Sequence, residues 1–217
     1  MEACVHTSSL SIGYRNKKAG DSLLAKDLSL SCYKGELLAL VGPNGCGKST
    51  LLRTLAGLHD PLQGEVSVDG VPIHECRAID RARLLSIVLT SMNAPANLKV
   101  RDLVSLGRTP YRSAFLPHDT EDRAAIKEAL HQAGVEHLAE KTLDTLSDGE
   151  AQKAMIARAL AQRTQAVILD EPTAHLDLIN RVEIARMLRE IARSRNEGSS
   201  WPPMIWRPSS GSPTGFG

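Results

Sequence analysis

The sequence predicts an α/β fold, and three observations support that prediction. An apolar run at residues 37–41 leads into a glycine-rich stretch and then into a helical segment, which is the pattern of a strand, a loop and a helix. A second apolar run, at residues 166–169, ends on two acidic residues and a proline. Between these two units, from about residue 100, helical periods replace the alternation that is typical of strands. A sheet with an inserted helical segment accounts for all three observations.

The composition is that of an ordinary globular chain. Of its 217 residues 42% are hydrophobic and 24% are charged, and the net charge of +1 gives no electrostatic case for nucleic acid as the main partner. No apolar run approaches the roughly 18–20 residues that span a bilayer, and the N-terminus lacks the features of a signal peptide, so a cytosolic protein is expected. Reduced, separate thiols are expected because no C-x-x-C spacing occurs among Cys4, Cys32, Cys46 and Cys76.

The first part of the chain is expected to form strands. Residues 10–12 and 28–32 alternate between apolar and polar side chains around a polar turn at residues 15–21, and residues 64–70 alternate into an Asp-Gly turn that predicts a hairpin. Tyr14 stands at the end of a predicted strand. Two interpretations of Tyr14 stay open: half-buried packing, or stacking on an adenine ring.

Residues 42–50 match the pattern G-x-x-x-x-G-K-[ST] in its required context of strand, loop and helix. Glycines let successive N–H groups turn toward an anion, and the following helix adds the positive end of its dipole. Lys48 is expected to reach the β- and γ-phosphates of a nucleotide, and the Ser49 hydroxyl to ligate Mg²⁺. The predicted phosphate-binding residues are Gly42, Pro43, Asn44, Gly45, Cys46, Gly47, Lys48, Ser49 and Thr50. The predicted fold is thus an α/β P-loop NTPase core with an N-terminal antiparallel β subdomain and an inserted α-helical subdomain.

The acidic end of the second apolar run supplies the partner that such a loop requires. Asp170 is expected to hold Mg²⁺, directly or through water, and Glu171 to orient or deprotonate the attacking water. Pro172 ends the strand, so both acids lie at its tip. A strand followed by acids is common in α/β folds and gains weight here only from the loop. Together the two motifs predict a bound nucleotide with Mg²⁺.

A capping box begins the helix that follows Leu146, because Ser147 stands three residues before Glu150. At this point the chain resembles the ATP-binding-cassette (ABC) family, whose signature here is usually Leu-Ser-Gly-Gly-Gln. The resemblance implies that residues 147–150 bind the γ-phosphate of the ATP held by the opposite subunit. These residues are Ser147, Asp148, Gly149 and Glu150. Asp148 and Glu150 depart from the usual signature and look like variants found in importers for iron complexes and cobalamin.

Other stretches extend this resemblance over residues 8 to about 193. Tyr14 falls where the family places its adenine-stacking aromatic residue, and Asp177 lies in a stretch that resembles the loop reaching across the family's dimer. Residues 106–111 look like a stretch of the iron-siderophore, haem and cobalamin importers, in the helical lobe that contacts the membrane subunit. The family's usual Gln beside Mg²⁺ is not evident, and Thr90 is the candidate for its place.

The resemblance implies an ATP-hydrolysing subunit of an importer for an iron–siderophore complex, haem or cobalamin. It implies a homodimer that closes on two ATP molecules, membrane permease subunits as partners, an indirect link to a substrate-binding protein, and no nucleic acid. The implied location is peripheral, on the cytoplasmic face of the plasma (inner) membrane. A soluble ABC ATPase acting on DNA or ribosomes is the alternative, although the chain has one phosphate loop and no sustained heptads.

The chain is expected to divide into residues 1–89 (the β-rich and loop part of the core), 90–162 (the helical subdomain), 163–195 (the second part of the core) and 196–217 (an aberrant, disordered tail). The family would continue after residue 195 with a buried strand and Thr-His-Asp. Residues 201–206 must be encoded TGG CCN CCN ATG ATH TGG, and the frame one base earlier permits Leu-Ala-Thr-His-Asp-Leu. A frameshift near residue 197 is therefore a hypothesis that resequencing tests.

Without a frameshift, the chain as written is expected to lack the last strand of the sheet and to be unstable at an unpaired sheet edge. It would bind ATP at Lys48 but turn it over slowly. An inert product of a damaged gene is a further alternative.

Overall fold

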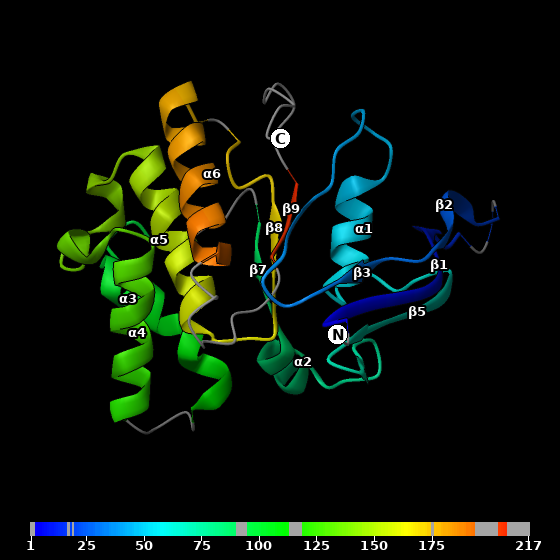
Figure 1. The fold of residues 1–217 in the computed structure, drawn as a ribbon, viewed down its shortest axis with the longest axis horizontal. Helices are drawn as coiled ribbons and strands as arrows, with labels where there is room; N and C mark the ends of the chain where they lie inside the picture. The colour runs from blue at the N-terminus through cyan, green and yellow to red at the C-terminus, as the bar shows by residue number, and fades with distance from the viewer. Residues whose placement is uncertain are drawn as a thin grey trace.

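The computed structural model describes residues 3–16, 18, 20–89, 95–112, 119–174, 176–193 and 204–207. Figure 1 shows a parallel sheet in the middle of the molecule, with a group of helices on one side. Helix α1 (Lys48–Leu55) and an antiparallel sheet lie on the other side. The predicted fold class, an α/β core with an antiparallel β part and an inserted helical part, is confirmed. The residue numbers proposed for the subdomain boundaries remain predictions.

The antiparallel sheet is built mainly from the first part of the chain. Its strands are β1 (Val5–Tyr14), β2 (Ser22–Leu28), β3 (Ser31–Cys32), β5 (Gln63–Val68) and β6 (Val71–Pro72). Their order is β2-β1-β5-β6, and β3 also pairs with β1. Asp69 and Gly70, both with positive φ, make the turn between β5 and β6, as the Asp-Gly pair predicted. The single strand expected at residues 28–32 is wrong, since β2 ends at Leu28 and β3 begins at Ser31.

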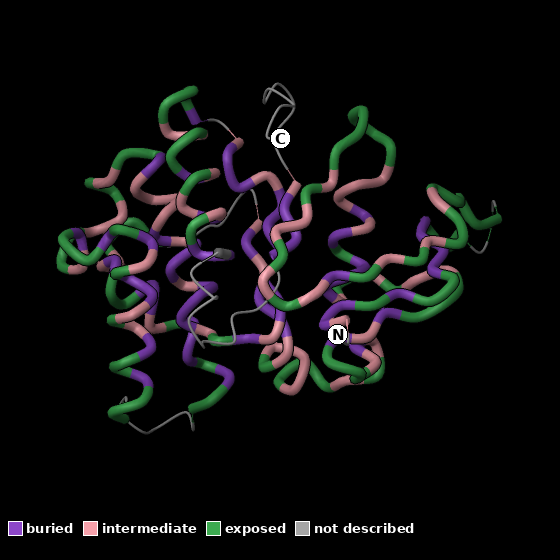
Figure 2. Tube along the Cα trace, viewed as in Figure 1, coloured by how far each residue is buried: buried purple, intermediate pink, exposed green. Residues whose placement is uncertain are grey.

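The parallel sheet places the site. It contains β4 (Leu37–Ala39), β7 (Leu85–Val88), β8 (Ala166–Asp170) and β9 (Met204–Arg207), in the order β4-β9-β8-β7. Successive side chains of β8 face opposite cores: Ile168 packs with residues of α1 and the antiparallel sheet, whereas Leu169 packs with residues of the helical lobe. Because both faces are covered, all five residues of β8 are buried (Figure 2).

The helices gather mostly between β7 and β8 in the sequence. Between these two strands lie α3 (Val100–Ser105), η1 (Leu106–Tyr111), α4 (Thr120–Gln132), η2 (Glu136–Leu138), η3 (Leu143–Thr145) and α5 (Asp148–Ala161). Helix α2 (Ala78–Leu84) precedes β7, and α6 (Leu178–Arg193) follows β8. Helix α4 begins where the sequence predicted, because the Asp119 side chain accepts a hydrogen bond from the Asp122 backbone N–H. Helix α5 packs against α3 and α4, so its buried alanines form the centre of the helical lobe.

Strand β9 corrects the expectation for the tail. The predicted absence of a last strand is wrong for Met204–Arg207, which pairs with β4 on one side and β8 on the other. Buried backbone groups of β4 and β8 need hydrogen-bond partners there, and the apolar side chains of β9 fit both cores. Ile205 faces the core beside α1, whereas Met204 and Trp206 face the helical side. The rest of residues 196–217 lies outside the described residues.

Candidate nucleotide-binding site

The glycine-rich stretch forms the connection from β4 to α1. Gly45 and Gly47 have φ angles of 80° and 95°, which glycine adopts without strain, and Gly47 directly precedes the first turn of α1. Strand β4 ends at Ala39, two residues earlier than the expected strand. Lys48 Nζ donates hydrogen bonds to the carbonyl oxygens of Gly42 and Pro43, at 2.7 and 2.6 Å. The ammonium group of Lys48 is thus held on the loop itself.

A cavity of about 530 Å³ lies against this loop, a size typical of small-ligand sites. It is lined by Tyr14, Leu24, Asn44, Gly45, Gly47, Lys48, Ser49, Thr50, Glu171 and Arg207. The cavity therefore brings together the ends of β1, β8 and β9 with the first turn of α1. Most of the predicted phosphate-binding residues border it, as do the predicted adenine-stacking and catalytic residues.

The two acids lie at the end of β8, as the sequence predicted. Asp170 is the last residue of the strand and is 5% exposed, and Glu171 follows with a φ of 51°. Burial raises the pKa of the Asp170 carboxyl, and the charge of Glu171 raises it further. Arg207 and Arg53 lower the same pKa by stabilising the carboxylate. The Glu171 backbone N–H donates to the Arg207 carbonyl at 3.0 Å, so the end of β9 fixes the position of these acids.

Arg207 occupies the place where the sequence predicted Mg²⁺. Ser49 and Asp170 offer a hydroxyl and a carboxylate, the hard oxygen donors that Mg²⁺ prefers. However, Arg207 Nη1 donates to Ser49 Oγ and lies 3.3 Å from Asp170 Oδ1, while Nη2 donates to Glu171 Oε1. One guanidinium thus contacts both expected metal ligands and the expected catalytic acid. As arranged, these residues do not fit a Mg²⁺ ion.

Tyr14 borders the cavity with 52% of its surface exposed. Its hydroxyl is 3.0 Å from Thr50 Oγ1, and its ring meets His59 edge to face at 5.3 Å. These contacts fix the ring beside the first turn of α1 and leave part of it accessible. Stacking of Tyr14 on an adenine ring stays a prediction.

The capping box at the start of α5 is confirmed. The Ser147 hydroxyl accepts from the Glu150 backbone N–H at 3.3 Å, and Glu150 Oε2 accepts from the Ser147 backbone N–H at 2.8 Å. None of residues 147–150 lines the cavity of its own chain. Their expected role toward a nucleotide on a second copy is therefore a proposal about an assembly.

We expect Ser147→Ala to lower the free energy of unfolding by about 1 kcal/mol at pH 7, because α5 loses its cap. Hydrogen bonds from the Ser147 backbone and hydroxyl lower the pKa of Glu150. The stability that the Glu150 carboxylate contributes is therefore present above the usual pKa of a glutamate, and it is lost as the pH falls through the lowered pKa. Glu150→Gln, whose amide oxygen can accept the same bonds, should remove that part of the acid dependence. Urea unfolding at pH 7 and at lower pH measures both effects, and an unchanged midpoint for Ser147→Ala would contradict the capping role.

The predicted dimer-loop residue, Asp177, directly precedes α6. Its carboxylate accepts from the Asn180 backbone N–H at 2.8 Å and from Asn180 Nδ2 at 2.9 Å. These hydrogen bonds lower the pKa of Asp177. A Cβ at Gly149 would come within 2.4 Å of Asn180 Oδ1, so Gly149 leaves space for this amide. The structure thus joins two motifs far apart in the sequence through Asn180, which the motifs did not predict.

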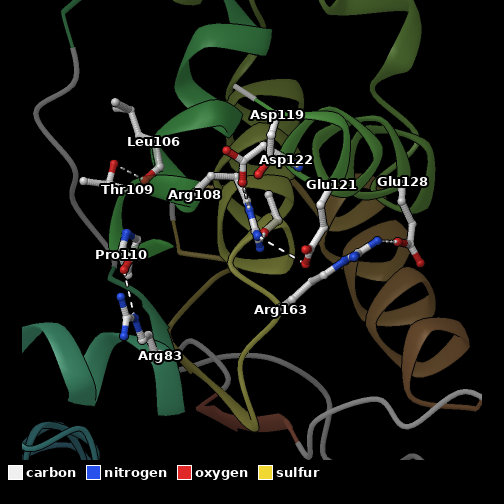
Figure 3. Close-up of polar contacts among 11 residues, drawn as sticks. Arg83, Leu106, Arg108, Thr109, Pro110, Asp119, Glu121, Asp122, Glu128 and Arg163 are labelled. Atoms are coloured by element: carbon white, nitrogen blue, oxygen red, sulfur yellow. Dashed lines mark hydrogen bonds and ion pairs between the residues drawn. The ribbon is translucent and has the colours of Figure 1, made fainter. Parts of the chain in front are cut away.

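The stretch at residues 106–111 forms η1 and is largely a structural element. Figure 3 shows Arg108 pointing toward Asp122 and Glu121 of α4. Arg108 is 3% exposed, its Nε donates to Asp122 Oδ1 at 2.7 Å, and its guanidinium lies 4.2 Å from the centre of the Tyr111 ring. The outer surface of the stretch is formed by Leu106, Thr109 and Tyr111, of which Leu106 and Tyr111 are 51% and 38% exposed. Thr90, the candidate for the missing Gln, lies outside the described residues.

Cys46 offers a direct probe of the loop. All four thiols are free, as predicted, but Cys46 is exposed whereas Cys4 and Cys32 are buried. Burial is the main cause that raises the pKa of Cys32 to about 12, so that thiol should react slowly.

We expect N-ethylmaleimide to label Cys46, and ATP at ten times its dissociation constant to slow that labelling about tenfold. Peptide mass spectrometry measures the rates, with half-buried Cys76 as the internal control. Equal protection of Cys46 and Cys76 would contradict binding at the loop.

Comparison with known proteins places this site in a family. The family model described as ABC transporter matches residues 25–174. The chain is 40% identical over 189 residues to the iron(3+)-hydroxamate import ATP-binding protein FhuC of Bacillus subtilis, covering 87% of this chain and 68% of that protein. It is 42% identical over 188 residues to the achromobactin transport ATP-binding protein CbrD of Dickeya dadantii, with the same coverage.

A solved structure supports the same assignment. The dimeric post-hydrolysis state of the ATP-binding cassette MJ0796, bound to ADP and Pi, superposes with a TM-score of 0.76 at 25% identity, over 94% of this chain and 88% of that one. The chain spans about two thirds of the length of the two curated relatives. No helix among the described residues has the length and apolar character to cross a membrane. The glycine-rich loop before α1, the acids at the end of β8 and these matches show that the chain belongs to the ABC transporter family, among its ATP-binding cassette ATPases.

Proposed function

We propose that this chain is the ATP-hydrolysing subunit of an importer that takes up iron–siderophore complexes. The observation that supports it most is the cavity of about 530 Å³, whose lining includes Lys48, Tyr14 and Glu171. The chain is 40% and 42% identical to the subunits named for iron(3+)-hydroxamate import and achromobactin transport. Among the substrates expected from the sequence, these relatives favour iron–siderophore complexes over haem and cobalamin.

In this proposal the phosphates of ATP lie on the loop and the adenine ring lies against Tyr14. Backbone N–H groups of residues 42–50 and the N-terminus of α1 bind the phosphates, and Lys48 adds its charge. Glu171 orients the attacking water and accepts its proton. Mg²⁺ at Ser49 and Asp170, which the sequence predicted, is not part of this proposal because Arg207 contacts both side chains.

The working assembly in this proposal is a homodimer bound to membrane permease subunits. Each ATP lies between the loop of one copy and residues 147–150 of the other, with Asp177 at the same interface. The exposed position of the capping box, outside its own cavity, supports this arrangement, as does the dimeric state of the similar MJ0796 cassette. The dimer sits on the cytoplasmic face of the plasma (inner) membrane, linked indirectly to a substrate-binding protein and without nucleic acid.

Uptake of radioactive iron tests this function. A strain of the native host that lacks the gene should lose uptake of a ferric hydroxamate siderophore, and the wild-type gene should restore it. Glu171→Gln should fail to restore uptake, because it removes the proposed base. Glu183→Gln is the matched control, since Glu183, on α6, forms an ion pair with Lys153 of α5, outside the cavity. Unchanged uptake in the deletion strain would contradict the proposal.

A further inference from the structure

The side chain of Arg207 is held at the edge of the nucleotide cavity by its place in the sheet. Arg207 is the last residue of β9 and pairs in register with Asp170, the last residue of β8. Its side chain is 13% exposed and borders the cavity together with Lys48 and Ser49. The backbone on both sides of β9 is bonded into the sheet, so the guanidinium is directed to this point by the fold.

The contacts of the guanidinium group are those expected of a bound cation. Nη1 donates to Ser49 Oγ and lies 3.3 Å from Asp170 Oδ1. Nη2 donates to Glu171 Oε1 and has a second N–H group. A Mg²⁺ ion held by Ser49 and Asp170 would have to occupy the space of Nη1. The fixed positive charge of Arg207 and a divalent cation therefore exclude each other at this point.

Guanidinium chemistry suits the role that the metal would otherwise have toward a nucleotide. The group stays charged at all working pH values, and its planar N–H groups bind phosphate oxygens in pairs. Lys48, whose ammonium is held on the loop, borders the same cavity. Lys48 and Arg207 thus line the space beside the loop, together with the Glu171 carboxylate that Arg207 contacts, where the terminal phosphates of ATP would lie.

We propose that Arg207 is a nucleotide-binding residue that replaces the divalent cation, so that this chain binds ATP without Mg²⁺. The inference rests on the proposed function only in placing ATP in the cavity. In this arrangement Lys48 and Arg207 together neutralise the terminal phosphates. The contact of Arg207 with Glu171 ties the expected catalytic acid to the same group.

Calorimetric titration of the full chain with AMP-PNP, a non-hydrolysable ATP analogue, tests the proposal in EDTA and in Mg²⁺. For the wild-type chain we expect dissociation constants that differ by less than about threefold between the two buffers. Arg207→Met keeps the apolar stem of the side chain but removes the charge. It should bind about 10- to 100-fold more weakly in EDTA, because charge-assisted hydrogen bonds to phosphate are lost, and Mg²⁺ should restore its affinity.

Two further variants make the result specific. Arg207→Lys keeps the charge without the paired N–H groups and should bind in EDTA with intermediate affinity. Arg163→Met is the matched control, because Arg163 pairs with Glu128 in the helical lobe, away from the cavity. Its affinity should equal that of the wild-type chain in both buffers.

The wild-type titration decides the question even if Arg207→Met fails to fold. Binding that is at least about tenfold tighter in Mg²⁺ than in EDTA would overturn the role of Arg207 and leave the proposed function standing. Equal affinities of Arg207→Met and the wild-type chain in EDTA would overturn it as well. An absence of binding in both buffers would overturn this inference and the proposed function together.

Discussion

Replacing Ile205 with aspartate is expected to abolish folding of the chain. Ile205 is 1% exposed in the middle of β9, where it packs in the core shared by α1 and the antiparallel sheet. The substitution removes an apolar contact worth about 2–5 kcal/mol and adds a buried, unpaired carboxylate that costs several more. Their sum is comparable to the whole stability of a typical domain, about 5–15 kcal/mol.

Circular dichroism and size-exclusion chromatography measure the effect of Ile205→Asp. Ile205→Val is the matched control, since it keeps the strand and should cost only about 0.5–1.5 kcal/mol. If the aspartate variant unfolded in urea at nearly the wild-type midpoint, β9 would not be part of the folded sheet. The tail would then be the disordered segment that the sequence suggested.

Replacing Arg108 with methionine is expected to lower the free energy of unfolding by about 3–5 kcal/mol. Arg108 and Asp122 are 3% and 4% exposed, and they bond at 2.7 Å between η1 and α4. Arg108 Nη1 also donates to the carbonyl oxygen of Ala161, at the end of α5, at 3.1 Å. Methionine fills much of the same volume but removes the positive charge that Arg108 presents to the buried Asp122 carboxylate. The loss should therefore come from charge and not from packing.

A double-mutant cycle separates these two causes. Arg108→Met combined with Asp122→Leu removes both charges and should be clearly more stable than Arg108→Met alone, because the buried carboxylate that faced the guanidinium is gone as well. Urea unfolding followed by far-ultraviolet circular dichroism gives the free energies. Additive losses in the double variant would show that packing decides the effect and would contradict the ion-pair account.

The parts of the site that the sequence predicted are those encoded within a few residues of each other. The loop at residues 42–50 needs only a strand, glycines and a helix in succession, and the acids at the end of β8 need only an apolar strand. The capping box of Ser147 and Glu150 spans four residues. Local chemistry determines these features, so periodicity and spacing were sufficient to find them.

The parts that the sequence did not predict depend on distant residues. Arg207 meets Ser49 across 158 positions, from a segment without periodicity, and no motif links the two. Arg108 lies in a stretch singled out for a family resemblance, and only the fold places it against Asp122. Asn180 is bonded to Asp177 beside Gly149 because α5 and α6 begin next to each other in space. Such pairings follow from packing, which one sequence does not specify position by position.

Titration of ATP into the wild-type chain and into Lys48→Ala tests most directly whether the loop holds the nucleotide. Lys48 borders the cavity, and charge-assisted hydrogen bonds from its ammonium to the phosphates should account for about 10- to 100-fold in affinity. Lys127→Ala, in α4 outside the cavity, serves as the control for the loss of one lysine. A loss of that size in Lys48→Ala alone is the result we predict. Equal affinities of Lys48→Ala and the wild-type chain would contradict the assignment of the site.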